Sequence, residues 1–180
     1  DAPGQDALDS TLGSLRLTRE DLPGGLRATL LIAGSEGHSD YGYDEDWSFV
    51  GFCEVFDCLA PPYSSFDNYI RDNRNTTVDV RAVSEPGRGR AGWVAGAYYR
   101  DQTQQLRRVY TFLADDFLRD YDTENRAVYG RLDLPLARRW NVVAGLRYER
   151  RAARYADSDG ARFDPDEDMW GGRLSLEYRP

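Results

Sequence analysis

The 180-residue sequence predicts an all-β fold, an antiparallel up-and-down meander of about seven strands. Three observations support this prediction. Apolar and polar residues alternate along most segments, no segment carries a clear apolar stripe of helical period, and short and long connections follow one another strictly. Only residues 101–113 contain good helix formers, and these are mixed with Thr, Val and Tyr.

The alternation is clearest in the last segment of the chain. Trp170, Gly172, Leu174, Leu176 and Tyr178 share one parity, and polar or small residues fill the other. Such a segment predicts a strand with one apolar and one polar face. The same pattern predicts further strands at 25–34, 75–84, 126–134 and 141–151, and weaker faces predict strands at 11–18 and 91–101.

The connections between these segments alternate in length. Short linkers fall at 19–24, 85–90 and 135–140, and long ones at 35–74, 102–125 and 152–169. Alternate connections of a meander lie at opposite ends, so all short turns are expected at one end and all long loops at the other. This is the layout of transmembrane β-barrels, and it favours one here. A soluble sheet would show the same alternation of side chains.

The composition excludes several classes of protein. With 31 acids against 23 Arg the formal net charge is −8, which disfavours binding to nucleic acid through phosphate contacts. Aromatic residues form 13% of the chain, far too many for a disordered acidic segment. No apolar run is long enough for a membrane-spanning helix. Nothing before Leu26 resembles a signal peptide, so we expect a processed chain or an internal segment.

Charge follows the predicted topology. The three long connections hold 20 acids and 7 Arg, a net charge of −13. Within the strands, most charges lie on the parity opposite the aliphatic side chains. If the aliphatic parity faces lipid, the opposite parity faces a polar lumen in which guanidinium groups are tolerated. The residues expected to face this lumen are Arg27, Arg81, Arg131 and Arg147.

Several spaced motifs resemble the barrel of TonB-dependent outer-membrane receptors. They are YGYDEDWSFVGF at 41–52, SSFDNYIRDNRNTTVDVRAVSEPGRG at 64–89, WVAGAYYRDQ at 93–102, NVVAGLRYERRAARYADSDG at 141–160 and FDPDEDMWGGRLSLEYR at 163–179. Their order matches the family, and the resemblance covers roughly residues 11–180.

The resemblance implies a section of a receptor of the Gram-negative outer membrane, so that the meander is part of a large transmembrane β-barrel. Members of the family have a 22-stranded barrel filled by an N-terminal plug that carries the TonB box, and this chain matches neither plug nor box. It implies active import of a bulky, scarce nutrient, such as a ferric siderophore, cobalamin or a glycan, with TonB-derived energy. The implied partners are outer-membrane lipid, the plug and the remaining strands of the same receptor, TonB through the plug, and the nutrient.

The predicted long loop 35–74 holds the candidate ligand contacts. Acidic residues are interleaved there with aromatic ones, a combination that suits a ligand entering the extracellular mouth and suits equally an aromatic girdle at the membrane boundary. The candidates are Tyr41, Tyr43, Asp44, Asp46, Trp47 and Phe49.

Two smaller motifs have structural or metal-binding interpretations. Cys53 and Cys58 are expected to form a disulfide that staples the longest loop, because one His in the chain is too few to complete a zinc site. Asp157, Asp159 and Asp164 surround a Gly turn and are a weak calcium candidate, although the spacing does not match an EF-hand and a solvated acidic loop explains the run as well. No cofactor is expected.

Catalysis has little support in the sequence. His38 lies in a Gly, Ser and Asp segment without a nucleophile beside it, so we expect no enzyme. The alternative to a transport receptor is a soluble or surface-displayed antiparallel β module whose acidic loops bind a glycan or a cation. That alternative predicts a closed two-layer core with the aliphatic parity packed inside.

Overall fold

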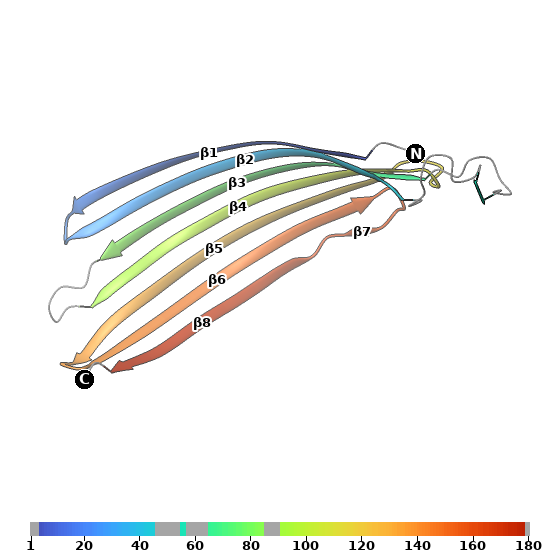
Figure 1. The fold of residues 1–180 in the computed structure, drawn as a ribbon. Coiled ribbons are helices and arrows are strands. Elements are labelled where there is room, and N and C mark those ends of the chain that lie inside the picture. Colours follow the sequence, from blue (N-terminus) through green and yellow to red (C-terminus); the bar gives the residue numbers. More distant parts are fainter. Residues whose placement is uncertain (1–3, 46–54, 57–64, 85–90, 179–180) are drawn as a thin grey trace.

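A computed structural model describes residues 4–45, 55–56, 65–84 and 91–178, and all of its strands belong to one antiparallel sheet (Figure 1). Each long strand pairs with the long strand that follows it along the chain. No helix in the described part of the chain could span a membrane. The strands are β1 Gln5–Leu22, β2 Leu26–Asp44, β3 Phe66–Ser84, β4 Gly92–Tyr110, β5 Phe117–Ala137, β6 Trp140–Asp157, β7 Arg162–Phe163 and β8 Asp166–Tyr178.

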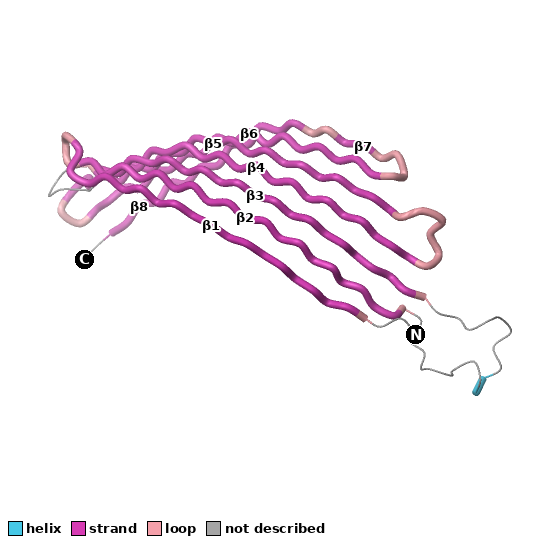
Figure 2. The backbone as a smooth tube through the Cα atoms, turned by 90° about the horizontal axis from the view of Figure 1, so that it is seen from above, coloured by secondary structure: helices cyan, strands magenta, loops and turns pink. Residues whose placement is uncertain are grey.

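The meander is confirmed, with seven long strands and the two-residue β7. β7 and β8 both pair with β6 in one continuous register, since Phe163 lies opposite Tyr155 and Asp166 lies opposite Ala152. Figures 1 and 2 show the long strands lying side by side in a single curved layer. The described residues therefore do not form the closed two-layer core that the soluble alternative predicts.

The predicted bounds of the strands and long loops are wrong. β2 continues to Asp44 and β3 begins at Phe66, so much of the predicted loop 35–74 is strand. β4 and β5 likewise take most of 102–125, and β6, β7 and β8 take most of 152–169. The backbone ladder needs only hydrogen-bonding partners and no apolar face, so polar residues extend the strands where alternation no longer signals them.

Successive long strands run in opposite directions as a meander requires. β1, β3 and β5 end at one end of the sheet, and β2, β4 and β6 end at the other (Figure 1). The turn after β1 is tight because Gly24 and Gly25 have φ of 84° and 72°, values that disfavour residues with a Cβ. The acidic segments of the sequence thus gather at the end opposite this turn, largely on strand extensions.

The register assigns each side chain to a face, because residues opposite one another in neighbouring antiparallel strands point to the same side. The two faces are defined by neighbouring rows of residues. The apolar face carries Leu30, Val80, Ala97, Val128, Tyr148 and Trp170 in one row. The polar face carries Thr29, Arg81, Gly96, Tyr129, Arg147 and Gly171.

Burial differs sharply between the two faces. On the apolar face Leu174 is 80% exposed and Leu146 is 58% exposed. On the polar face Thr29, Ala127 and Val143 are buried, under longer neighbouring side chains. The usual arrangement of a soluble protein is therefore reversed, and the large aliphatic groups of the described sheet are the ones left uncovered.

Candidate ligand-contact site

An Asp–Arg pair anchors the polar face near the long connections. Asp67 begins β3, and Arg108 lies near the end of β4 on the same face. The Arg108 Nε and Nη2 atoms donate to the two Asp67 oxygens at 2.8 and 2.6 Å. The Asp67 side chain is only 1% exposed, so this bidentate pair is shielded from water on the carboxylate side. It ties the start of β3 to the end of β4.

Tyrosines complete the shell around Asp67. The hydroxyl groups of Tyr69 and Tyr43 donate to Asp67 Oδ2 at 3.0 and 3.4 Å. The Arg108 guanidinium also lies 5.3 Å from the Tyr69 ring centroid and 4.9 Å from that of Tyr110. The Arg108 hydrogen bonds lower the pKa of Asp67 below its usual range, while burial raises the pKa of both Tyr43 and Tyr69. The cluster therefore presents phenol groups and a fixed cation around an ionised carboxylate.

Part of the predicted contact set belongs to this cluster. Tyr41 and Tyr43 end β2 on the polar face with ring centroids 5.8 Å apart, and Asp44 is the last residue of that strand. The other candidates, Asp46, Trp47 and Phe49, lie outside the described residues, as do Cys53 and Cys58.

The central members Asp67, Tyr69 and Arg108 were missed by the sequence. They are 41 residues apart at the extremes, and only the β3–β4 register brings them together. The one signal that could have indicated this pair is an acidic residue and an Arg at the outer ends of two neighbouring strands. That signal can be used only when the register of the two strands is known.

The weak calcium candidate is not supported. Asp157 Oδ2 accepts the Tyr155 hydroxyl at 2.8 Å, and Asp157 Oδ1 accepts the Ala161 N–H at 2.9 Å. These bonds lower the pKa of Asp157 and close a turn through Gly160, whose φ is 91°. Within the described residues no three His, Cys, Asp or Glu side chains are grouped to hold a metal, so Asp159 and Asp164 do not join Asp157 in a ligand set.

Two cavities open on the polar face, and one of them adjoins the cluster. One, of about 540 Å³, is lined by Tyr69, Arg108 and the β4–β5 connection. The other, of about 290 Å³, is lined by three aromatic rings, those of Tyr121, Tyr155 and Phe163, together with Arg151. Both are open hollows, and both offer ring surface next to a guanidinium group.

The four arginines expected in a lumen all lie on the polar face. Arg27 and Arg131 share one row, and Arg81 and Arg147 share the next. Each lies within 4.0 Å of a carboxylate; for example, Arg147 Nη2 is 2.7 Å from Glu149 Oε2.

A tyrosine crosses the polar face between these arginines. The Tyr129 hydroxyl donates to Asp79 Oδ2 at 2.9 Å, although the two residues lie on β5 and β3 with β4 between them. The ring passes over Gly96 of β4, where an added Cβ would stand 2.5 Å from Tyr129 Cζ. Gly96 is therefore required by this close crossing.

Aromatic pairs mark both margins of the aliphatic region on the apolar face. Trp140 and Tyr178 have ring centroids 4.8 Å apart near the short turns, and Tyr148 and Trp170 are 4.7 Å apart further along the same strands. Aliphatic and small side chains fill the interval on β6 and β8: Val142, Ala144, Leu146, Gly172, Leu174 and Leu176.

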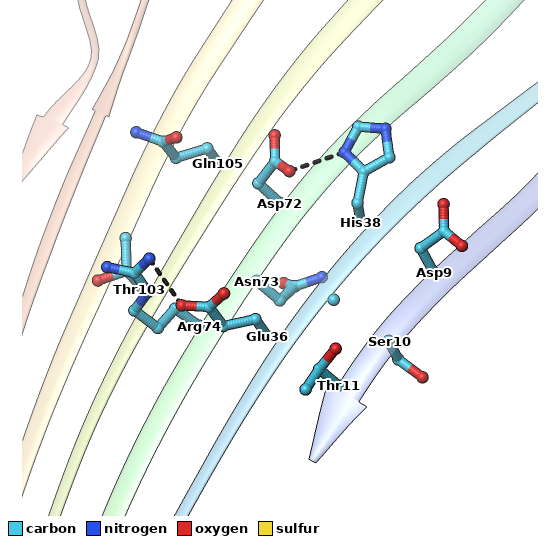
Figure 3. Close-up of a pocket in the computed structure, with 11 residues that line it drawn as sticks. Asp9, Ser10, Thr11, Glu36, His38, Asp72, Asn73, Arg74, Thr103 and Gln105 are labelled. Carbon is cyan, nitrogen blue, oxygen red and sulfur yellow. Dashed lines mark hydrogen bonds and ion pairs between the residues drawn. The ribbon is translucent and has the colours of Figure 1, made fainter. Parts of the chain in front are cut away.

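Beyond the second aromatic pair the apolar face becomes polar. Figure 3 shows a hollow there, where His38 Nδ1 is 2.7 Å from Asp72 Oδ1 and Arg74 Nη2 is 2.7 Å from Glu36 Oε1. The Asp72 hydrogen bond raises the pKa of His38. His38 is thus part of an exposed cross-strand pair, and no nucleophilic Ser, Thr or Cys is hydrogen-bonded to it among the described residues.

Comparison with known proteins identifies the family. The sequence model of the family described as TonB dependent receptor-like, beta-barrel matches residues 2–180, so the chain belongs to this family and is a section of an outer-membrane β-barrel domain. No match was found among curated proteins.

Solved receptors share the fold. The siderophore receptor PiuA from Acinetobacter baumannii matches with a TM-score of 0.71 at 16% identity, over 96% of this chain and 30% of that one. The ferric yersiniabactin uptake receptor FyuA from Yersinia pestis matches with a TM-score of 0.63 at 15% identity, over 98% and 26%. The ferric preacinetobactin receptor BauA from Acinetobacter baumannii matches with 0.60 at 12%, over 94% and 28%. The chain therefore spans less than a third of each of these receptors.

Proposed function

We propose that the chain is a wall section of an outer-membrane receptor that imports a bulky, scarce nutrient with TonB-derived energy. One observation carries the proposal most directly. The large aliphatic side chains lie uncovered on one face of the sheet, and aromatic pairs bound them at both margins. In water such a face would be an association hazard, whereas in a bilayer it is the surface that hydrocarbon requires.

The dimensions of the apolar face support contact with lipid. From Trp140 to Tyr148 is eight residues along β6, about 26 Å at roughly 3.3 Å per residue. A strand tilted by about 40° then spans about 20 Å along the membrane normal, close to the roughly 25 Å apolar band of outer-membrane barrels. The strand extensions beyond Tyr148 would stand outside the hydrocarbon, which agrees with their charge.

The polar face would line the lumen. Side chains converge on the concave side of a curved sheet and diverge on the convex side, so the burial of Thr29, Ala127 and Val143 favours a concave polar face. Arg27 and Arg81 would then line the barrel wall towards the plug, together with Arg131 and Arg147. The plug, the remaining strands and the coupling to TonB would be supplied by other parts of the receptor.

The Asp67 cluster would contribute to the ligand-binding mouth. It lies at the end of the sheet with the long connections, and it combines Tyr41, Tyr43 and Tyr69 with the fixed Arg108 cation. The substrates that this mouth would take are those of nutrient receptors, namely a ferric siderophore, a corrinoid or a glycan. Nothing in the arrangement resembles a catalytic site, and we propose transport and not catalysis.

Growth under nutrient limitation tests the proposed transport. A strain that lacks the full-length receptor is compared with its parent on iron supplied only as defined siderophores, on limiting cobalamin, and on single glycans as carbon source. We expect a growth defect in one condition, restored by the wild-type gene but not by one with Tyr41→Ala and Tyr43→Ala. Equal growth of both strains in every condition would contradict nutrient import, and recovery of the receptor in the soluble fraction would contradict the membrane location.

A further inference from the structure

Beyond the aliphatic region, some arginines pair with carboxylates and others do not. On the apolar face, beyond the aliphatic region, Arg74, Arg107, Arg126 and Arg150 each contact a carboxylate. In three of these pairs the nitrogen–oxygen distances are 2.7, 2.6 and 2.7 Å. The charge of these exposed guanidinium groups is therefore compensated within the sheet.

At the same level on the polar face, Arg100 and Arg151 contact only neutral groups. Arg100 Nε donates to Asn75 Oδ1 at 2.7 Å, and its Nη2 donates to Gln102 Oε1. Arg151 Nη2 donates to the Tyr121 hydroxyl at 2.7 Å. These bonds hold both guanidinium groups in place, but they use few of the five N–H donors of each and include no carboxylate.

Arg71 and Arg119 lack a carboxylate partner as well. The Arg71 guanidinium lies over the Tyr69 ring, 5.0 Å from its centroid. Arg119 Nε is buried without any hydrogen-bond acceptor, and an unsatisfied buried donor on a charged group costs free energy of folding. Within the part of the chain that the structure describes, none of these four polar-face arginines forms an ion pair.

The four arginines surround a region of neutral, hydrogen-bonding side chains, here called the amide floor. Arg71 and Arg119 lie in one row of the polar face, two strands apart, and Arg100 and Arg151 lie in another, also two strands apart. Two strands span about 10 Å and the two rows are about 20 Å apart along the strands. The rows between them carry amide and hydroxyl side chains across β3, β4 and β5: Asn73, Asn75, Gln102, Gln104, Tyr121 and Thr123.

The carboxylates near these four arginines are fewer than the guanidinium groups, and most of their oxygens have other partners. Asp157 lies opposite Arg119, but its oxygens accept the Tyr155 hydroxyl and the Ala161 N–H. Glu167 lies opposite Arg151 on the edge strand β8 and is exposed. Glu149 lies one row from Arg151 and interacts with it electrostatically, but its oxygens accept from Asn125 and Arg147. Four cations therefore face two carboxylates in their own rows and Glu149 beside them, in a chain whose formal net charge is −8.

We propose that Arg71, Arg100, Arg119 and Arg151 form a binding patch for a polyanionic substrate about 10 to 20 Å across. Guanidinium groups match carboxylate and phosphate oxygens in bidentate geometry, and four of them around an amide floor suit a ligand with several such groups. The aromatic cavity beside Arg151 and Tyr121 would take an apolar portion of the same molecule. The inference rests on the proposed import function and narrows its substrate to anions.

Binding of polyanions to the purified full-length receptor in detergent tests the patch. The probes are tripolyphosphate and ferric citrate, and neutral ferrichrome is the uncharged comparison. We expect both anions to bind at millimolar concentration or tighter, and each Arg→Gln substitution in the patch to weaken binding about tenfold, because a hydrogen bond to a charged group contributes about 1.5 kcal/mol or more. Arg100→Lys, which keeps the charge, should lose less than Arg100→Gln.

The control variant replaces arginines of the apolar face, Arg74→Gln together with Arg126→Gln, and should bind both anions like the wild type. Heat-modifiable migration in SDS gels verifies that every variant has a folded barrel. Absence of binding by the wild type, or unchanged binding after all four patch substitutions, would overturn the inference. The growth assay above is independent of this result: a receptor that supports growth but binds neither anion would refute the patch and leave the import function standing.

Discussion

Leu174→Arg gives the most direct test of the lipid-facing assignment. Leu174 is 80% exposed on the apolar face of β8, midway between Trp170 and Tyr178. In a soluble protein an Arg at such a position would change stability by less than about 0.5 kcal/mol. In a bilayer the same side chain must enter hydrocarbon, and the two environments therefore give opposite expectations.

The expected magnitude follows from the depth of the position. Leu174 is four residues from each aromatic margin, about 13 Å along the strand and about 10 Å below either interface at a tilt of about 40°. This is the midplane, where Arg on the lipid face costs about 2 to 4 kcal/mol. We expect the folding equilibrium in lipid vesicles to shift by about 30-fold to 1,000-fold towards the unfolded state.

Guanidinium titrations of the full-length receptor in vesicles measure this shift. The matched control is Ser175→Arg, which places the same side chain one residue away on the polar face and should be nearly neutral. Equal stability of the two variants would refute the assignment of the faces. A larger loss for Ser175→Arg than for Leu174→Arg would reverse it.

Three further perturbations address individual interactions. Asp67→Ala leaves Arg108 without its bidentate partner and should cost about 3 kcal/mol locally, seen as about 100-fold faster amide exchange at the β3–β4 end. Because the pKa of Asp67 is lowered, wild-type protection there should persist as pH falls through about 4 and be lost only below it. Gly96→Ala should destabilise the receptor by about 2 kcal/mol, since the new methyl group meets the Tyr129 ring and the Val80 carbonyl. His38, whose pKa is raised, should titrate above 6.5 by NMR, and the stabilisation from its pairing with Asp72 should be complete below 6.5 and fade as pH rises through the raised value.

Each of these three predictions has its own control. Asp72→Ala removes an exposed partner and should leave amide exchange nearly unchanged, so an equal effect of Asp67→Ala would contradict the role of burial. Gly130→Ala meets no atom closer than 3.6 Å and should be tolerated on steric grounds. In Asp72→Ala the His38 pKa should fall towards 6.5, and an unchanged value would disprove the pairing.

The sequence predicted the faces of the strands better than their ends. The parity of Leu174 and Leu176 against Arg173 and Glu177 is visible in the letters, because side chains alternate with period two whatever the partner strand is. The ends were wrong because 35–44 and 66–74 do not alternate between apolar and polar residues, and only pairing with a neighbouring strand holds them extended.

The residues of the candidate site also divide into those that the sequence predicted and those that it did not. Tyr41 and Tyr43 were predicted from local composition, and both are in the cluster around Asp67. Asp67 and Arg108 were not predicted, because their contact depends on a register between residues 41 positions apart.

The sequence by itself determined that this chain is a two-faced antiparallel meander with its acidic segments at one end, because alternation and connection length are local properties. Only the tertiary structure decided where the strands stop, and that Tyr129 crosses Gly96 to reach Asp79. It alone decided that Arg74, Arg107, Arg126 and Arg150 pair with carboxylates while Arg100 and Arg151 do not. These features arise from cross-strand register, and register is fixed by pairing along the whole sheet and by no short stretch of sequence.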